Sequence, residues 1–178
     1  GYTVSAILLT HHEIMSSLVS IIIPTKNSAR TIGKCLESIK NQTYTAIEII
    51  VVDNFSTDDT REIAKQYTDA VFEKWPERTT QKNYGIKKAK GEYLLIIDGD
   101  MSIDAGLISE CVNLLQSDEK NAWVCIPVKD VGSSFWTHVI AYERSFYKWT
   151  AMETARFLRA DLVRKVGGYK DIIFYEEF

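Results

Sequence analysis

Short apolar runs alternate with amphipathic segments along most of the chain. Apolar side chains dominate residues 19–23 and 47–52 and fill residues 94–97, and each run ends at a proline or an aspartate. Runs this short and this rich in Val and Ile are typical of strands buried on both faces of a parallel sheet. Between the first two, residues 29–41 repeat apolar positions at i, i+3, i+4 and i+7, which predicts an amphipathic helix. The alternation predicts right-handed βαβ units and an α/β fold with a mostly parallel central sheet.

The same patterns continue to the end of the chain. Ser56 and Asp59 have the spacing of a capping box, which predicts a helix that carries Ile63, Ala64 and Tyr67. Further helices are predicted over residues 78–90, 104–116, 137–149 and 160–166, and shorter strands near residues 70–72, 123–127 and 153–158. Gly167-Gly168-Tyr169 predicts a turn.

Length and composition indicate one globular domain. The chain has 178 residues, of which 46% are hydrophobic and 25% are charged. We expect residues 15–178 to form this domain. Residues 1–14 are expected to be an upstream extension or a cloning remnant, with an extra edge strand over residues 3–9 as the alternative. No apolar run is long enough to cross a bilayer.

Charge and cysteine usage narrow the function classes. A formal net charge of -3 argues against a nucleic-acid-binding protein. The three cysteines have apolar neighbours and no metal-ligand spacing; they are Cys35, Cys111 and Cys125. This pattern predicts buried thiols in a reducing compartment, so we expect a cytoplasmic protein.

Polar side chains follow three of the predicted strands at the point where each strand ends. They are Pro24, Thr25 and Asn27 after the first strand, Asp53 and Asn54 after the second, and Asp98, Gly99 and Asp100 after the strand at 94–97. Ligands of open α/β sheets bind beyond the carboxyl ends of the strands. The first two groups are able to hold a nucleoside through hydroxyl, amide and carboxylate groups. Two carboxylates separated by one residue favour a hard divalent cation shared with a phosphate, although a plain turn has the same pattern.

Basic residues near the start of the helix at 78–90 are candidates for phosphate contacts. Arg78 and Lys82 lie there, where a helix favours anions. The lysines at residues 87–90 are interpreted instead as a solvated helix face. The glycine-rich phosphate loops of dinucleotide-binding and P-loop proteins are absent from the sequence. A metal-bound nucleoside diphosphate, with the acidic pair Glu176-Glu177 downstream, fits transfer of a group from a nucleotide carrier.

Four segments resemble family 2 glycosyltransferases of the GT-A fold. They are VSIIIPTKN at 19–27, IIVVDNFSTDDT at 49–60, AKGEYLLIIDGD at 89–100, and Gly167-Gly168-Tyr169 followed by Glu176-Glu177. The segments occur in the family's order over residues 19–178. The resemblance implies a three-layer α/β/α domain with a Rossmann-like nucleotide-binding half. It also implies inverting, metal-dependent transfer of a sugar from a UDP- or GDP-linked donor to a hydroxyl acceptor, either a glycan or a lipid-linked molecule.

The resemblance assigns roles to the polar strand ends. Asp53 or Asn54 would bind the nucleotide base, and relatives usually carry two aspartates there, so the choice stays open. The residues expected nearby are Pro24, Thr25 and Asn27. Asp98 and Asp100, on either side of Gly99, would hold Mn²⁺ or Mg²⁺ against the diphosphate, where the ion stabilises the leaving group.

The resemblance also assigns the acidic pair. Glu177, with Glu176 as the alternative, would deprotonate the acceptor hydroxyl opposite the leaving group. Relatives usually carry Glu-Asp at these two positions and continue well beyond them. We therefore expect the domain to be incomplete at its C-terminus.

Two other functions stay open at this point. A nucleotidyltransferase that makes sugar nucleotides needs a glycine-rich basic loop after the first strand, and residues 25–30 contain no glycine. A non-catalytic nucleotide-sugar-binding module is the second alternative. The aromatic residues of segment 137–149 leave a lipid-linked acceptor open, with peripheral contact at the cytoplasmic face of a membrane. The sequence leaves the oligomeric state open.

Overall fold

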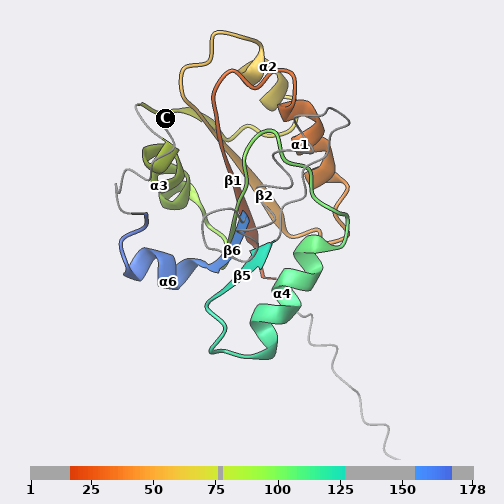
Figure 1. Cartoon of the computed structure of the whole chain (residues 1–178), viewed down its shortest axis with the longest axis vertical. Coiled ribbons are helices and arrows are strands. Elements are labelled where there is room, and N and C mark those ends of the chain that lie inside the picture. Colours follow the sequence, from red (N-terminus) through yellow and green to blue (C-terminus); the bar gives the residue numbers. More distant parts are fainter. Residues whose placement is uncertain (1–16, 76–77, 127–154, 170–178) are drawn as a thin grey trace, which may run out of the picture.

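A computed structural model describes residues 17–75, 78–126 and 155–169 of the chain. Strands and helices alternate along most of this part (Figure 1). In chain order they are β1 (Val19–Thr25), α1 (Ile32–Lys40), β2 (Ile47–Asp53), α2 (Thr60–Ala64), β3 (Val71–Glu73), α3 (Arg78–Lys88), β4 (Tyr93–Ile96), α4 (Leu107–Ser117), β5 (Trp123–Ile126), β6 (Ala155–Arg159) and α6 (Ala160–Lys165). Within these residues no helix is long and apolar enough to cross a membrane.

The strands form one mostly parallel sheet, as the sequence predicts. Its order is β3-β2-β1-β4-β6-β5. β1 pairs in parallel with β2 and β4, and β2 pairs in parallel with β3. β6 is antiparallel to both of its neighbours, β4 and β5. The parallel half therefore places the carboxyl ends of β1, β2 and β4 along one edge of the sheet.

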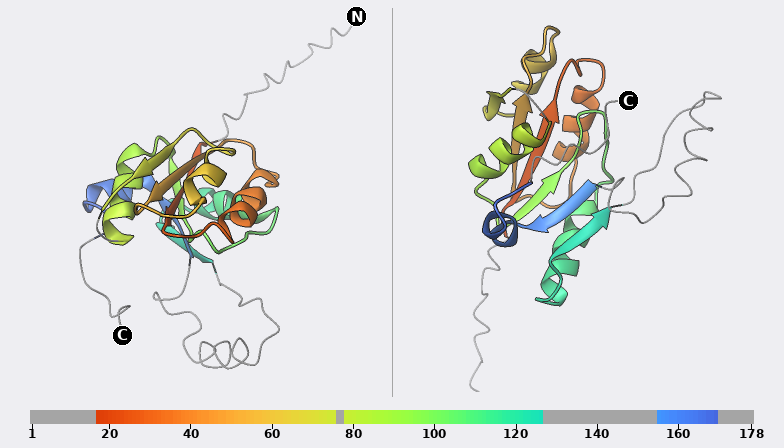
Figure 2. Two further views of the ribbon diagram at one scale, coloured as in Figure 1. Left: turned by 90° about the horizontal axis from the view of Figure 1, so that it is seen from above. Right: turned by 60° about the vertical axis from the view of Figure 1, so that its left-hand side comes forward.

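Helices cover both faces of the sheet and give three layers (Figure 2). Along β1, Ile21 and Ile23 pack into a core with α1, α2 and α4, whereas Ile22 packs into a second core with α3 and α6. Successive strand residues point to opposite faces, so consecutive apolar residues of one strand fill both cores. The three-layer α/β/α prediction is confirmed.

The capping-box prediction is wrong. Asp59 is the N-cap of α2 and makes no side-chain cap hydrogen bond. The Ser56 hydroxyl donates instead to Asp53, because the carboxylate at the end of β2 lies within its reach. α2 ends at Ala64, so it carries Ile63 and Ala64 as predicted, whereas Tyr67 lies beyond its last residue.

Other differences are smaller. α1 and α4 each begin three residues later than predicted, and β1 continues through the buried Pro24 to Thr25. Of the three thiols, Cys35 and Cys111 are buried as expected, whereas Cys125 is only half-buried. The predicted helix at 137–149, the acidic pair and the N-terminal extension lie outside the described residues.

Candidate functional site

A cavity of about 470 Å³ opens at the carboxyl ends of β1, β2 and β4. Its lining comes from the loops after these three strands and from the first turn of α3. The lining residues predicted from sequence are Pro24, Thr25, Asn27, Asn54, Arg78, Asp98, Gly99 and Asp100. The structure therefore brings together most of the candidate nucleotide-binding and metal-binding residues.

Thr25 lines this cavity, and its side-chain hydroxyl is buried. The residue is 5% exposed, and its Oγ1 has no hydrogen-bond partner among the described residues. Gly99 lies directly against it, because a Cβ at this position would stand 3.2 Å from Thr25 Oγ1. A buried hydroxyl without a partner costs free energy unless a ligand or water satisfies it. The Thr25 hydroxyl is thus a buried polar group beside the cavity whose hydrogen bond the described residues do not supply.

The Asp98-Gly99-Asp100 segment forms a turn beside β1. The carbonyl oxygen of Asp98 accepts from the amide of Met101 at 3.0 Å and from the thiol of Cys35 at 3.7 Å. Burial, with a smaller contribution from the negative charges of Asp100 and Asp98, raises the pKa of Cys35 to about 12. The two carboxylates therefore concentrate negative charge at one end of the cavity.

The donor set suits a divalent cation that is shared with a ligand. Asp98 and Asp100 supply hard carboxylate oxygens, whereas the described residues contain no group of three His, Cys, Asp or Glu side chains able to hold a metal by themselves. Mg²⁺ usually takes one or two carboxylates and completes its shell with water and substrate phosphates. The residues present fit that kind of ion.

Asp53 and Asn54, between which the sequence did not decide, have different environments in the structure. Asp53 is fully buried, and its carboxylate accepts from the backbone amide of Ser56 at 2.7 Å and from the hydroxyl of Ser56 at 2.5 Å. Asn54 lines the cavity. Asp53 therefore shapes the loop after β2, and Asn54 is the residue of the pair that lines the cavity.

Asn27 ties the loop after β1 to the loop after β2. Its backbone is left-handed, with φ of 49°, a conformation that Asn tolerates better than most residues. Its side-chain Oδ1 accepts from the backbone amide of Thr57 at 2.9 Å, and its backbone amide donates to Ser56 Oγ at 2.7 Å. Asn27 borders the cavity, but its side-chain oxygen serves this loop contact.

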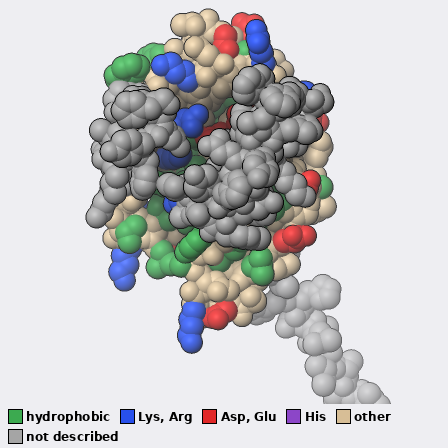
Figure 3. Space-filling model, viewed as in Figure 1, with side chains coloured by type: hydrophobic (Ala, Val, Ile, Leu, Met, Phe, Trp, Pro, Cys, Tyr) green, Lys and Arg blue, Asp and Glu red, His purple; other side chains and the backbone are tan. Residues whose placement is uncertain are grey.

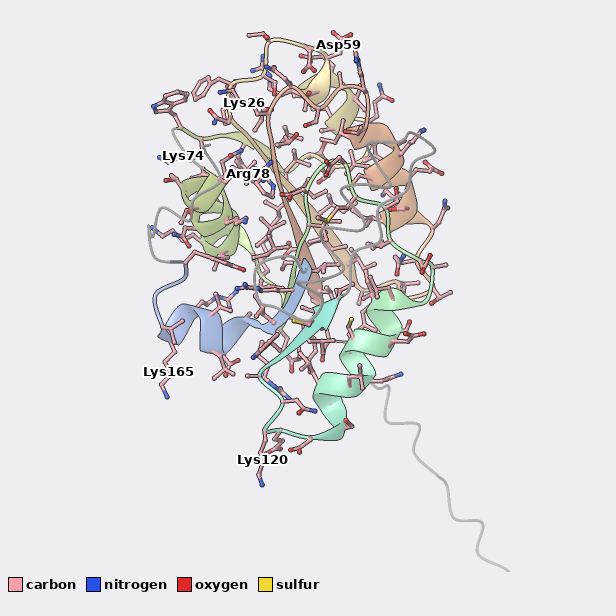
Figure 4. The ribbon with its side chains drawn as sticks, viewed as in Figure 1. Lys26, Asp59, Lys74, Arg78, Lys120 and Lys165 are labelled. Carbon is pink, nitrogen blue, oxygen red and sulfur yellow. The ribbon has the colours of Figure 1, made fainter. Side chains whose placement is uncertain are left out.

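Of the two basic residues on α3 that the sequence offered as phosphate contacts, Arg78 lies at the cavity and Lys82 does not. Arg78 lines the cavity, and its Nη1 lies 3.7 Å from Asp98 Oδ2. Figure 4 shows Arg78 and Lys26 on the same side of the molecule, over the ends of the strands, and Figure 3 shows basic and acidic side chains beside one another in the upper half of that face. The structure does not bring Lys82 to this cavity, because its ammonium lies 5.6 Å from the ring centroid of Tyr169.

Gln81 is a residue of the site that sequence reasoning missed. It lies one turn into α3, is 2% exposed and also lines the cavity. Its Nε2 donates to the carbonyl oxygen of Thr25 at 3.0 Å and to that of Val52 at 2.6 Å. One amide thus joins the ends of β1 and β2 to the helix. In the sequence it is one more polar residue of a basic helix, so nothing local distinguishes it.

Comparison with known proteins identifies the family. The model of the family described as Glycosyl transferase family 2 matches residues 20–169, which is most of the chain. The chain belongs to glycosyl transferase family 2. All three strand ends of the cavity lie within the matched residues of this family 2 domain.

Curated relatives carry glycosyltransferase names. The domain is 36% identical over 119 residues to Glycosyltransferase GlyG of Streptococcus pneumoniae serotype 4, covering 63% of this chain and 39% of the relative. It is 30% identical over 161 residues to the PGL/p-HBAD biosynthesis glycosyltransferase of Mycobacterium bovis, covering 85% of this chain and 63% of the relative. The family 2 chain thus spans less than two thirds of the length of these relatives.

Solved structures share the fold of this family 2 domain. The mannosyltransferase PcManGT from Pyrobaculum calidifontis, in complex with GDP-Man and Mn²⁺, superimposes with a TM-score of 0.69 at 24% identity, covering 88% of this chain and 48% of that one. TarS from S. aureus gives a TM-score of 0.67 at 23% identity over 84% of this chain and 49% of that one. The GT-A assignment is confirmed.

Proposed function

We propose that the cavity holds the nucleoside diphosphate of a nucleotide sugar, and that the whole protein transfers the sugar to a hydroxyl acceptor with inversion. The observation that carries this proposal is the convergence of three strand ends on one cavity. Thr25, Asn54 and the Asp98 turn all line the same space. TarS, which shares the fold, has been solved with UDP-GlcNAc, and this supports the donor class.

The residues divide between the two ends of such a donor. The base lies beside Asn54, whose amide offers both a donor and an acceptor to a base edge. Thr25 lines the cavity next to the same nucleoside. Arg78 offers a guanidinium to the diphosphate at the other end, next to Asp98.

A divalent ion bound by Asp98 and Asp100 would neutralise the diphosphate and stabilise it as a leaving group. The guanidinium of Arg78 and the divalent ion are both positively charged. Both would therefore stabilise the negative charge of the bound diphosphate. The fold-sharing mannosyltransferase was solved with Mn²⁺, which supports metal use here without deciding between Mn²⁺ and Mg²⁺. Glu177, or Glu176 next to it, remains our prediction for the group that deprotonates the acceptor.

Calorimetric titration of UDP and GDP, with and without Mn²⁺ or Mg²⁺, tests the donor half of the proposal. In the wild type we expect the metal to tighten binding. In Asp98→Asn and in Asp100→Asn this metal-dependent part should be lost, a decrease of about tenfold or more, because each variant removes one of two carboxylate ligands.

Asp104→Asn is the matched control. It removes the same charge from an exposed residue outside the cavity lining and should bind the nucleotides as the wild type does. Wild-type affinity in both Asp98→Asn and Asp100→Asn, at every metal concentration, would exclude the proposed metal site. Slow hydrolysis of a nucleotide sugar by the wild type would favour the transferase over a binding module.

A further inference from the structure

Basic side chains gather on the face of the sheet that α3 and α6 cover. The eleven residues of α3 include four basic ones and no acidic one, and α6 adds two basic residues and one acidic residue. The helices of the opposite face, α1, α2 and α4, together carry three basic and three acidic residues. The chain as a whole has a formal net charge of -3. The positive charge of the α3 and α6 face is therefore a local feature and does not follow from composition.

The lysines near the end of α3 lie at the surface. Lys87 and Lys88 are exposed, and so is Lys90 just beyond the helix. The ammonium of Lys88 lies 5.3 Å from the ring centroid of Phe72 and 5.4 Å from that of Tyr84. The two rings meet edge to face, with their centroids 5.6 Å apart. Cations and half-buried aromatic rings therefore share this part of the surface.

Helix α6 adds exposed aliphatic side chains. Leu162 is 36% exposed and Val166, the C-cap residue, is 72% exposed. The amide of Val166 donates to the carbonyl oxygen of Leu162 at 3.1 Å, so the two residues lie one above the other on the same side of the helix. Ala160 and Val163, by contrast, are buried against the sheet. Lys165 projects away from the domain (Figure 4). Helix α6 thus turns aliphatic side chains and a cation outward.

The end of α3 and the outward side of α6 are neighbours. Arg164 Nη2 donates to the carbonyl oxygen of Ala89, one residue beyond α3, at 2.8 Å. Both views of Figure 2 show α3 and α6 on the same side of the sheet. The exposed side chains of the two helices therefore form one surface, which we call the α3–α6 surface. Its members are Lys87, Lys88, Leu162, Lys165 and Val166.

We propose that the α3–α6 surface docks the protein on an anionic lipid bilayer. Lysines near such a bilayer are attracted by the lipid phosphates, and exposed aliphatic side chains strengthen binding when they enter the boundary between headgroups and acyl chains. A nucleic acid would also attract the cations, but it offers no apolar phase to Leu162 and Val166. Phosphate headgroups above an acyl layer match both kinds of side chain.

Helix α3 relates this surface to the cavity at the strand ends. The helix begins at Arg78, which lines the cavity, and ends at Lys88. Its eleven residues span about 16 Å, at about 1.5 Å per residue. Docking on the α3–α6 surface therefore brings the cavity close to the membrane. The docking itself does not depend on the proposed function.

Vesicle co-sedimentation of the whole chain tests the proposal. The vesicles consist of phosphatidylcholine alone, or of phosphatidylcholine mixed with phosphatidylglycerol, at low and at high salt. One double variant, Lys87→Glu with Lys165→Glu, reverses two charges of the surface. A second, Leu162→Ser with Val166→Ser, removes its aliphatic side chains.

Matched controls change the opposite face of the sheet. Lys34→Glu with Lys65→Glu reverses two charges at exposed positions on α1 and at the end of α2. Leu114→Ser removes an aliphatic side chain of α4 that is 52% exposed. Because all these positions lie at the surface, every variant should keep the wild-type circular dichroism spectrum.

We expect the wild type to bind the vesicles with phosphatidylglycerol about tenfold or more tightly than phosphatidylcholine alone, and to lose most of this preference at high salt. The lysine double variant should bind the anionic vesicles about tenfold or more weakly. The aliphatic double variant should bind them about fivefold more weakly, and its loss should persist at high salt. Both controls should stay within about twofold of the wild type.

Two results would overturn the proposal. One is a wild type that binds neither kind of vesicle, and dimers detected by light scattering in the same sample would then assign the α3–α6 surface to a second copy of the chain. The other is an equal loss in the surface variants and in their controls, because it would show that binding follows net charge and not this surface.

Discussion

Replacing Gln81 by glutamate places a carboxylate where the structure needs an amide donor. Gln81 Nε2 donates to the carbonyl oxygens of Thr25 and Val52, and the residue is 2% exposed. Glutamate has the same shape, so no cavity forms. When ionised it has no proton to donate and faces two carbonyl oxygens in a buried site. When protonated it regains one of the two hydrogen bonds.

The magnitude follows from these contacts. Thr25 O keeps a second partner, because the amide of Asn54 also donates to it at 2.8 Å. Loss of one hydrogen bond at low pH should therefore cost about 1 kcal/mol. Burial and the carbonyl dipoles raise the pKa of the new carboxyl above about 4.3, its ordinary value. Because the pKa is higher in the folded state, the variant keeps its stability below pH 4.3 and loses it as the pH rises toward the folded-state pKa. The loss is about 1.4 kcal/mol for each pH unit in that range.

Urea unfolding at pH 4.5 and at pH 7.5 measures the effect. The free energy of unfolding of Gln81→Glu should be lower than that of the wild type by about 1 kcal/mol at pH 4.5. At pH 7.5 it should be lower by about 3 kcal/mol or more. Gln66→Glu, at an exposed position, is the control and should stay within about 0.5 kcal/mol at both. An equal difference at the two pH values would refute the reasoning, because it would mean that residue 81 does not titrate in a buried site.

Two further predictions concern packing and thiol chemistry. Gly85→Ala should destabilise the domain by about 1–3 kcal/mol, because a Cβ there would collide with Ile22, whereas Gly33→Ala, with its nearest neighbour at 3.6 Å, should not; equal thermal-unfolding shifts would contradict this. Burial raises the pKa of Cys35 to about 12 from 9.0, so native protein at pH 8 should leave this thiol unlabelled by iodoacetamide, as peptide mass spectrometry would show. The stability that the neutral Cys35 thiol contributes should be present below pH 9 and be lost as the pH rises through about 12. Cys35→Ala should therefore lose less stability than the wild type over this alkaline range. Rapid labelling of Cys35 in the native protein would contradict its assignment as a buried thiol.

The sequence alone determined the layers of the domain and the location of its cavity. Apolar runs and helical periodicity are local signals, and they placed β1, β2 and β4 and the polar residues that follow them. Because parallel strands end at a common edge, these local signals sufficed to predict that Thr25, Asn54 and Asp98 would meet. The antiparallel insertion of β6 beside β4 carried no such signal, since either strand direction buries the same alternating side chains.

The tertiary structure decided which polar residues line the cavity and which hold the loops around it. The sequence does not distinguish the roles of Asp53 and Asn54. In the structure Asp53 is fully buried and accepts two hydrogen bonds from Ser56, which hold the loop after β2. Gln81 is an ordinary polar residue of a basic helix until its partners, 29 and 56 residues away, are known. A hydrogen bond over such a separation depends on how α3 packs against the sheet, and no local pattern encodes that packing.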